Sequence, residues 1–294
     1  MMNESHEILR KKEMKNPTKL LRETIKLLIA EELQQPSLGF TTVKDQRGMI
    51  IGVVFDTTNI LQTIENDPDI KKHIDILDRS ENSSVSKYSA MTNLSVKFRF
   101  TFEQAFYDSI VAMVAVQPPL YTCAKSYEIK FAAGPGEREI IADMLAHMSA
   151  ITGTNRYIAD REFVSSAGRA AWWLMSRRVP DDGKIPLDNV EHPPKGKDPF
   201  HDKHHTPDDP DDDCSTYLPS PGNKKDRTLD AINHALTVKP TGKHNMQSYE
   251  NNAKGLFQAI RNSHGPISGL FDVTRPIESA TLMYFDNHFN ELRP

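Results

Sequence analysis

The sequence predicts an α+β protein: a small mixed sheet with several packed helices, a long proline-rich acidic arm, and a helical C-terminal part. Strand and helix patterns alternate between residues 41 and 179, whereas the helical pattern fails across 180–225, where nine prolines occur. Helical spacing then resumes. We therefore expect a body at 1–179, an arm or linker at 180–225, and a C-terminal part at 226–294 that packs on the body.

The charge of the chain is unevenly distributed. The 294 residues have 38% hydrophobic and 26% charged side chains and a net charge of −4, which excludes a wholly disordered chain. Residues 181–213 contain eleven acidic residues against four lysines, a net charge of −7, so the rest of the chain carries +3. A mildly basic body therefore carries an acidic arm, which could act as an internal mimic of nucleic acid.

The expected location is the cytoplasm, which for a viral protein means that of the host. The N-terminus has no apolar stretch of the kind that secretory signals contain. The longest apolar run, Ile110 to Val116, is too short to span a bilayer, so we expect no membrane association. Two cysteines far apart in sequence, Cys123 and Cys214, fit a reducing compartment.

The first 93 residues predict helices around one pair of strands. Asn16 followed by Pro17 is typical of a helix start, and this helix would have a basic outer face. The pattern of residues 41–55 predicts two strands joined by a turn at Asp45–Gly48, the second strand being buried on both faces. The expected helices are 17–33, 57–65 and 68–77, and the serine-rich stretch 79–93 is expected to be a loop.

The middle of the chain predicts two more strands. Residues 94–100 alternate, which places Lys97 and Arg99 on one face of a strand with aromatic neighbours. Thr101 and Gln104 have capping-box spacing, so a helix is expected at 102–116. Residues 125–131 predict a strand whose outward set is left open between its odd-numbered and even-numbered positions, and a helix is expected at 137–150. Whether the strands pair in parallel is also left open.

Residues 155–179 predict an amphipathic helix that is central to the functional hypothesis. At 100° per residue, Phe163, Val164, Ala167, Ala170, Ala171, Leu174 and Met175 form an apolar face. The opposite face carries Arg161, Arg169 and Trp172, with Arg177 nearby. We therefore expect Trp172 to be exposed among arginines, although burial by another part of the chain is the alternative. Three further helices are expected at 227–238, 247–263 and 276–292.

No catalytic, cofactor or metal motif is predicted. The arm contains residue types that bind metals, but their spacing fits neither a zinc motif nor an EF-hand. His147 and His234, in expected helices, are interpreted as structural. The metal-ligand types in the arm are His192, His201, Asp202, His204, His205, Asp208, Asp209, Asp211, Asp212, Asp213 and Cys214.

The leading hypothesis is a non-enzymatic protein that binds RNA or other single-stranded nucleic acid. Lysine and arginine would contact phosphates, and Trp172 would stack on a base. One alternative is a viral, phage-like assembly or scaffold protein that forms homo-oligomers through the arm, and another is an enzyme whose site is closed by residues 180–225. The expected nucleic-acid contacts are Arg10, Lys11, Lys12, Lys15, Lys19, Lys97, Arg99, Arg161, Arg169, Trp172, Arg177 and Arg178.

Overall fold

The computed structural model describes residues 37–79, 83–118, 125–134, 138–160, 164–187, 231–232, 234–262 and 273–292. The chain divides into two compact units. Unit 1 comprises residues 1–40, 54–110 and 248–284, and unit 2 comprises residues 41–53, 111–247 and 285–294. None of the described helices has the length and apolar character needed to cross a membrane.

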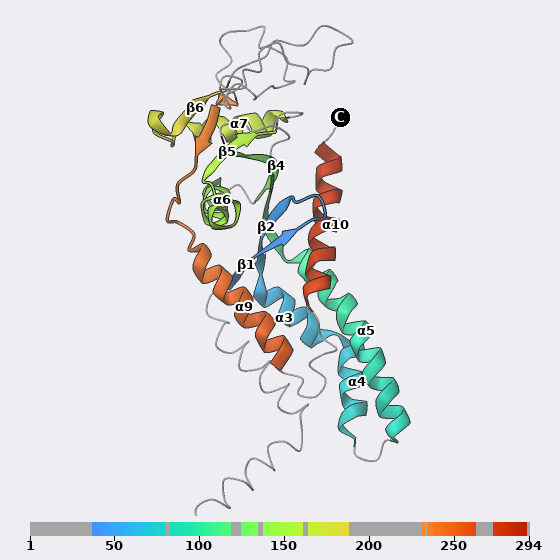
Figure 1. Ribbon diagram of the computed structural model, residues 1–294. Coiled ribbons are helices and arrows are strands. Elements are labelled where there is room, and N and C mark those ends of the chain that lie inside the picture. Colours follow the sequence, from blue (N-terminus) through green and yellow to red (C-terminus); the bar gives the residue numbers. More distant parts are fainter. Residues whose placement is uncertain are drawn as a thin grey trace, which may run out of the picture. The chain divides into compact units, whose positions relative to one another are not determined.

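The described residues form the α+β fold that the sequence predicts, around a mixed sheet of seven strands (Figure 1). The strand order is β1-β2-β3-β4-β5-β7-β6. β4 and β5 run parallel, whereas the pairs β3–β4, β5–β7 and β6–β7 are antiparallel. The strands are β1 (Leu38–Lys44), β2 (Ile50–Asp56), β3 (Ile110–Gln117), β4 (Tyr127–Ala133), β5 (Arg156–Ala159), β6 (Lys184–Pro186) and β7 (His234–Thr237).

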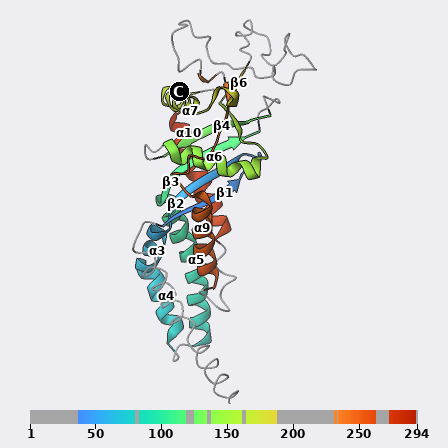
Figure 2. The same cartoon turned by 90° about the vertical axis from the view of Figure 1, so that its left-hand side faces the viewer.

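Unit 1 is a helical unit whose helices begin at well-formed caps. α3 (Thr57–Asn66) and α4 (Pro68–Asp78) start at Asp56 and Asp67, whose carboxylates each accept two backbone N–H groups. α4 lies beside the long helix α5 (Ser84–Asp108) in both views (Figures 1 and 2). α9 (Met246–Asn262), from Ser248 onward, and α10 (Thr274–Leu292), up to Tyr284, complete the unit.

Aromatic side chains fill the core of unit 1. Phe98, Phe102 and Phe106 lie at four-residue spacing on α5, with ring centroids 6.0 and 6.2 Å apart in succession. The ring of Phe55, from the end of β2, lies 4.7 Å from Phe106 and 5.9 Å from Phe257 of α9. These contacts join segments that are far apart in sequence.

The prediction of a loop at 79–93 and a strand at 94–100 is wrong, because residues 84–108 form the single helix α5. The alternation of apolar residues led to the wrong prediction of a strand because Leu94 and Phe98 are four residues apart, a spacing that fits a helix as well as a strand. In the structure both are buried, whereas Val96 and Phe100 are exposed. The capping-box prediction fails too: Thr101 lies inside α5, and its hydroxyl donates to the Asp67 carboxylate at 2.7 Å.

In three regions where the sequence predicts a helix, the structure has a strand over part of the range. The helix expected at 102–116 ends at Asp108, and 110–117 form the strand β3, because a continuous apolar run does not distinguish the helical from the strand period. Residues 156–159 form β5, so only Ser166–Ser176 of the expected helix 155–179 is helical. Residues 234–237 form β7, which places His234 in a strand.

Several other predictions are confirmed. The strands at 41–55, their turn at Asp45–Gly48, and the helices at 57–65 and 68–77 are present. So are the helices expected at 137–150, 247–263 and 276–292, within a few residues at their ends. Residues 184–186 of the expected arm form β6. The helix expected at 17–33 and the arm from residue 188 lie outside the described residues, and the division into body, arm and C-terminal part stays a prediction.

Unit 2 contains the parallel crossover from β4 through α6 (Arg138–Thr152) to β5. Tyr157 of β5 is fully buried, and its hydroxyl donates to the Leu145 carbonyl of α6 at 2.7 Å. The chain turns from α6 into β5 at Gly153, whose φ of 73° belongs to the left-handed region that favours glycine. One hydrogen bond thus fixes α6 against the strand that follows it.

Burial raises the pKa of Tyr157 to about 12, above its ordinary value of 10.0. Because the folded pKa is the higher one, the stabilising contribution of the neutral phenol is complete below pH 10 and is lost as the pH rises through about 12. We expect the free energy of unfolding to fall in this window for the wild type and less for Tyr157→Phe. Urea denaturation at several pH values measures both, and equal slopes would contradict the prediction.

Candidate nucleic-acid interface

The helix α7 (Ser166–Ser176) presents a different face from the one expected. Trp172 is only 4% exposed, so the prediction that it lies among arginines at the surface is wrong. Ala171, expected on the buried face, is exposed. The helix is shorter than predicted and buries the large indole, as aromatic side chains usually do.

Two donors on α7 are buried with no hydrogen-bond partner among the residues that the structure describes: Nε1 of Trp172 and Nε of Arg169. Neither atom is available at the surface to a phosphate or a base. Trp172 and Arg169 therefore do not form the exposed stacking surface that the sequence predicted, and replacing Trp172 would disturb packing rather than test a contact.

The aromatic residue available near the end of α7 is Trp173, which is partly exposed. The guanidinium carbon of Arg177 lies 5.1 Å from the centre of its ring, a cation–π distance. Arg177 itself is exposed. An indole held beside a guanidinium group therefore does exist in unit 2, one residue further along the chain than predicted.

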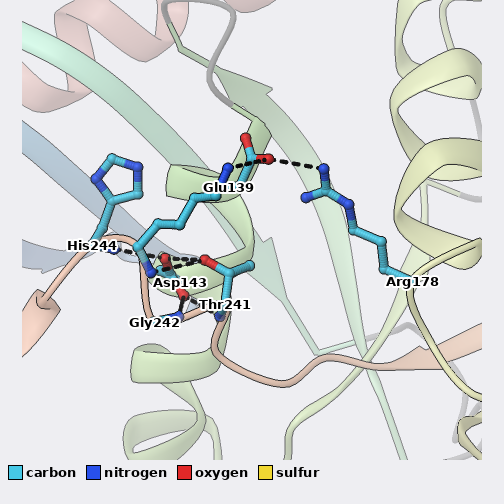
Figure 3. A network of polar contacts seen from close by, with 7 residues as sticks. Glu139, Asp143, Arg178, Thr241, Gly242 and His244 are labelled. Carbon is cyan, nitrogen blue, oxygen red and sulfur yellow. Dashed lines mark hydrogen bonds and ion pairs between the residues drawn. The ribbon is translucent and has the colours of Figure 1, made fainter.

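A buried carboxylate anchors the connection between β7 and α9. Asp143 of α6 is 2% exposed and accepts from the amides of Thr241, Gly242 and His244 at 2.5, 3.3 and 3.1 Å (Figure 3). It also accepts from the Thr241 hydroxyl at 2.6 Å. Gly242 has a φ of 75°, which lets consecutive amides turn toward one carboxylate. This loop is therefore fixed to α6 although residues 239–243 are exposed.

Glu139 lies one helical turn before Asp143 and brings two cations together. Its Oε1 accepts from the guanidinium group of Arg178 at 2.8 Å and from the ammonium group of Lys243 at 3.0 Å (Figure 3). The two cationic side chains are 55% and 65% exposed, so each keeps donors directed to solvent. One carboxylate thus holds a cation from the end of α7 beside a cation from the anchored loop.

The segments that supply Arg178 and Lys243 carry further charged side chains. Lys239 is exposed in the same loop as Lys243, and Asp181 of the short 3-10 turn η1 (Asp181–Gly183) pairs with Lys184 at 2.8 Å. We define the basic surface of unit 2 as a set of cationic side chains and carboxylates from these segments. Its cations are Arg177, Arg178, Lys184, Lys239 and Lys243, and its carboxylates are Glu139, Asp181 and Asp182.

Among the described residues, the other two expected contacts are not part of the basic surface of unit 2. Lys97 and Arg99 belong to unit 1 and lie on the helix α5 rather than on a strand. Lys97 is paired with Asp67 and Asp69, at 3.6 and 3.2 Å. Those that lie outside the described residues are Arg10, Lys11, Lys12, Lys15, Lys19 and Arg161.

A second polar cluster in unit 2 is internal. The Lys130 ammonium group lies 2.9 Å from Glu128 and 3.1 Å from Asp160, and all three side chains are buried. Burial favours the neutral amine, but the two carboxylates outweigh it and raise the pKa of Lys130. Glu128 and Lys130 of β4 thus face this cluster, which ties β4 to the end of β5. Phe131 is also buried and Ala132 is exposed, so neither alternating set of β4 faces the interior along the whole strand.

Within the described ranges, no three histidine, cysteine, aspartate or glutamate side chains are grouped as a metal site would require. The metal-ligand types of the arm, His192 to Cys214, lie outside these ranges. No protein-family model matches the chain, and no curated protein or solved structure shows significant similarity to it.

The basic surface depends on residues that the sequence analysis did not select: Glu139, Asp143, Lys239 and Lys243. The two carboxylates lie in α6 and the two lysines in the loop that follows β7, about 100 residues later in the sequence. The only local signal was Thr241-Gly242-Lys243, a small turn with one lysine, and nothing in it indicates that α6 supplies the opposing carboxylates.

Removing the charge of Asp143 should cost far more stability than removing that of Glu139. Asp143→Asn would leave the three loop amides facing an amide nitrogen or a weaker acceptor, and we expect a loss of about 2–3 kcal/mol in the free energy of unfolding. Glu139→Gln makes the same chemical change on a partly exposed side chain of the same helix, whose partners are exposed, and serves as the matched control. Urea denaturation measures both, and equal losses would contradict the assigned role of Asp143.

Hydrogen bonds from Lys243, from its own amide at the start of α6 and from Arg178 lower the pKa of Glu139 from 4.5 to about 2. Because the folded pKa is the lower one, the stabilisation is present above pH 4.5 and is lost as the pH falls through about 2. We expect the carboxyl carbon of Glu139 to titrate near pH 2 by NMR, and nearer 4.5 in Lys243→Ala. A wild-type midpoint near 4.5 would contradict the two ion pairs.

Proposed function

We propose that the protein binds single-stranded nucleic acid, RNA in particular, in the cytoplasm, through the basic surface of unit 2. The observation that carries the proposal is the single Glu139 carboxylate that holds Arg178 and Lys243 side by side. Two cations share one negative charge, so the pair has positive charge left for an anion. The role is one of binding, and it requires no reaction.

Contacts with the backbone of a nucleic acid would use both cations that Glu139 holds. Arg178 and Lys243 would contact neighbouring phosphates, the first through its planar fork of donors and the second as a compact charge. Arg177 precedes Arg178 and Lys239 precedes Lys243 in sequence, and both add positive charge to these segments. Affinity of this kind falls steeply with salt because each phosphate contact releases counterions.

A preference for single strands rests on Trp173 and Arg177. A partly exposed indole with a guanidinium group 5.1 Å from its centre offers a stacking surface to an unpaired base. A base in a duplex has no free face to offer. Trp173 therefore replaces Trp172 in the proposal, and Arg169 has no place in it because its Nε is buried.

The proposal is tested by fluorescence anisotropy of a labelled single-stranded RNA at several salt concentrations. Arg178→Ala and Lys243→Ala should each weaken binding several-fold and lower the magnitude of the salt slope by about one. Trp173→Leu should weaken binding to the single strand by about 1–3 kcal/mol and leave duplex binding nearly unchanged.

The matched controls are Lys71→Ala and Lys72→Ala, which remove the same charge from exposed positions on α4 of unit 1. They should leave the affinity within twofold of the wild type. Equal losses at α4 and at the basic surface would indicate a general effect of charge. Absence of binding at low salt would refute the proposed function.

A further inference from the structure

Four large apolar side chains lie in one exposed stripe along α5: Val85, Tyr88, Val96 and Phe100. They are 77%, 69%, 53% and 64% exposed, respectively. At 100° per residue they fall within about 120° of one another around the helix axis, and the stripe is about 22 Å long. Among the described residues, only Ile151 and Met283 are comparably exposed large apolar side chains, and neither lies on α5.

The same side of α5 is covered where the stripe ends. Glu103 accepts from the Ser279 hydroxyl of α10 at 2.7 Å, and the rings of Tyr107 and Tyr284 lie 5.4 Å apart. The helix face that packs against α10 at residues 103–107 therefore continues toward the N-terminus of α5 as apolar side chains open to solvent. An apolar stripe of this kind on a long helix is typical of a docking surface.

We infer that this stripe is the contact between two copies of the chain, with the two α5 helices antiparallel around a twofold axis. A twofold contact requires a surface that is complementary to itself. In the antiparallel arrangement Val85 lies opposite Phe100 of the second copy, and Tyr88 lies opposite Val96. Each contact pairs one β-branched side chain with one aromatic ring, which lets large and small side chains interlock.

The register supports this arrangement. The two pairings need alignments that differ by only one residue, so a single antiparallel alignment serves both. The axis then falls next to Thr92, whose hydroxyl already donates to the Tyr88 carbonyl at 3.1 Å. The donor of the central residue is thus used within its own helix, which suits the middle of an apolar contact. A parallel pair would instead place Phe100 against Phe100 and leave no small partner for either ring.

The size of the stripe sets the strength of the dimer. The exposed parts of its two aromatic rings amount to roughly 250 Å², the apolar centre of an interface rather than a full one of about 800 Å² for each partner. We therefore expect a dimer that dissociates at micromolar concentrations. Ser89 and Arg99 lie between the apolar side chains within the arc of the stripe, and Asn93 lies at its edge, so the interface would enclose polar as well as apolar side chains.

Analytical ultracentrifugation of the full chain without nucleic acid tests the dimer over a range of about 1–100 μM. The wild type should pass from monomer to dimer, and Phe100→Glu and Tyr88→Glu should stay monomeric with an unchanged circular dichroism spectrum. Lys72→Glu, an exposed change on α4, should dimerise as the wild type does. A monomeric wild type at every concentration overturns the inference, including the case in which another segment of the same chain covers the stripe.

Disulfide cross-linking tests the register in a background with Cys123→Ser and Cys214→Ser. Thr92→Cys should cross-link to itself, because residue 92 lies next to the axis. Val85→Cys alone should not, because its copies would be about 22 Å apart, but it should cross-link when mixed with Phe100→Cys. Self-linking of Val85→Cys would show a parallel pair and overturn the antiparallel arrangement.

Discussion

The Asp143 carboxylate is the constraint on which the basic surface of unit 2 depends. A buried charge is stable only where hydrogen bonds surround it, and three amides and one hydroxyl of residues 241–244 do so here. The Lys243 ammonium group also ties the loop to α6, through Glu139, but this side chain is exposed and an exposed ion pair is weak. Asp143 therefore fixes the backbone, and the fixed backbone brings Lys243 to Glu139. Without Asp143, the loop would lose the hydrogen bonds that bring Lys243 to Glu139, beside Arg178 at the end of α7.

The sequence predicted the elements whose signal is local. Asp67-Pro68 marked the start of α4, and Asp45–Gly48 marked the turn between β1 and β2, because caps and turns are determined by neighbouring residues. It failed where the same residues suit two structures. The runs 94–100 and 110–116 were assigned to the wrong class because burial by distant segments, and not local preference, decides between helix and strand.

The candidate site was predictable only in part, for the same reason. The basic end of α7 at Arg177 and Arg178 could be read from the chain, as could a tryptophan beside arginine. Which of two adjacent indoles is exposed could not, because it depends on what packs against a helix that proved shorter than expected. Glu139 and Lys243 are 104 residues apart, and their contact follows from the fold of unit 2 rather than from any motif.

Each unit thus has a surface suited to binding a partner: the surface of unit 2 is cationic, and that of unit 1 is apolar. Unit 2 has cations in excess of carboxylates, which suits a polyanion, and unit 1 has an apolar stripe, which suits a second copy of itself. A weak dimer would place two basic surfaces in one particle and raise the avidity for a long strand without a new contact. Single-stranded binding and self-association would then be properties of one assembly.

Amide hydrogen exchange in the loop, followed by NMR, tests the role of Asp143 most directly. The amides of Thr241, Gly242 and His244 should exchange slowly in the free protein, although residues 241 and 242 are exposed, because each donates to the buried carboxylate. In Asp143→Asn the same three amides should lose that protection while the amides of β4 and β5 keep theirs. Exchange of the three wild-type amides at the rate of an unstructured peptide would contradict a loop held by Asp143, and with it the preformed basic surface.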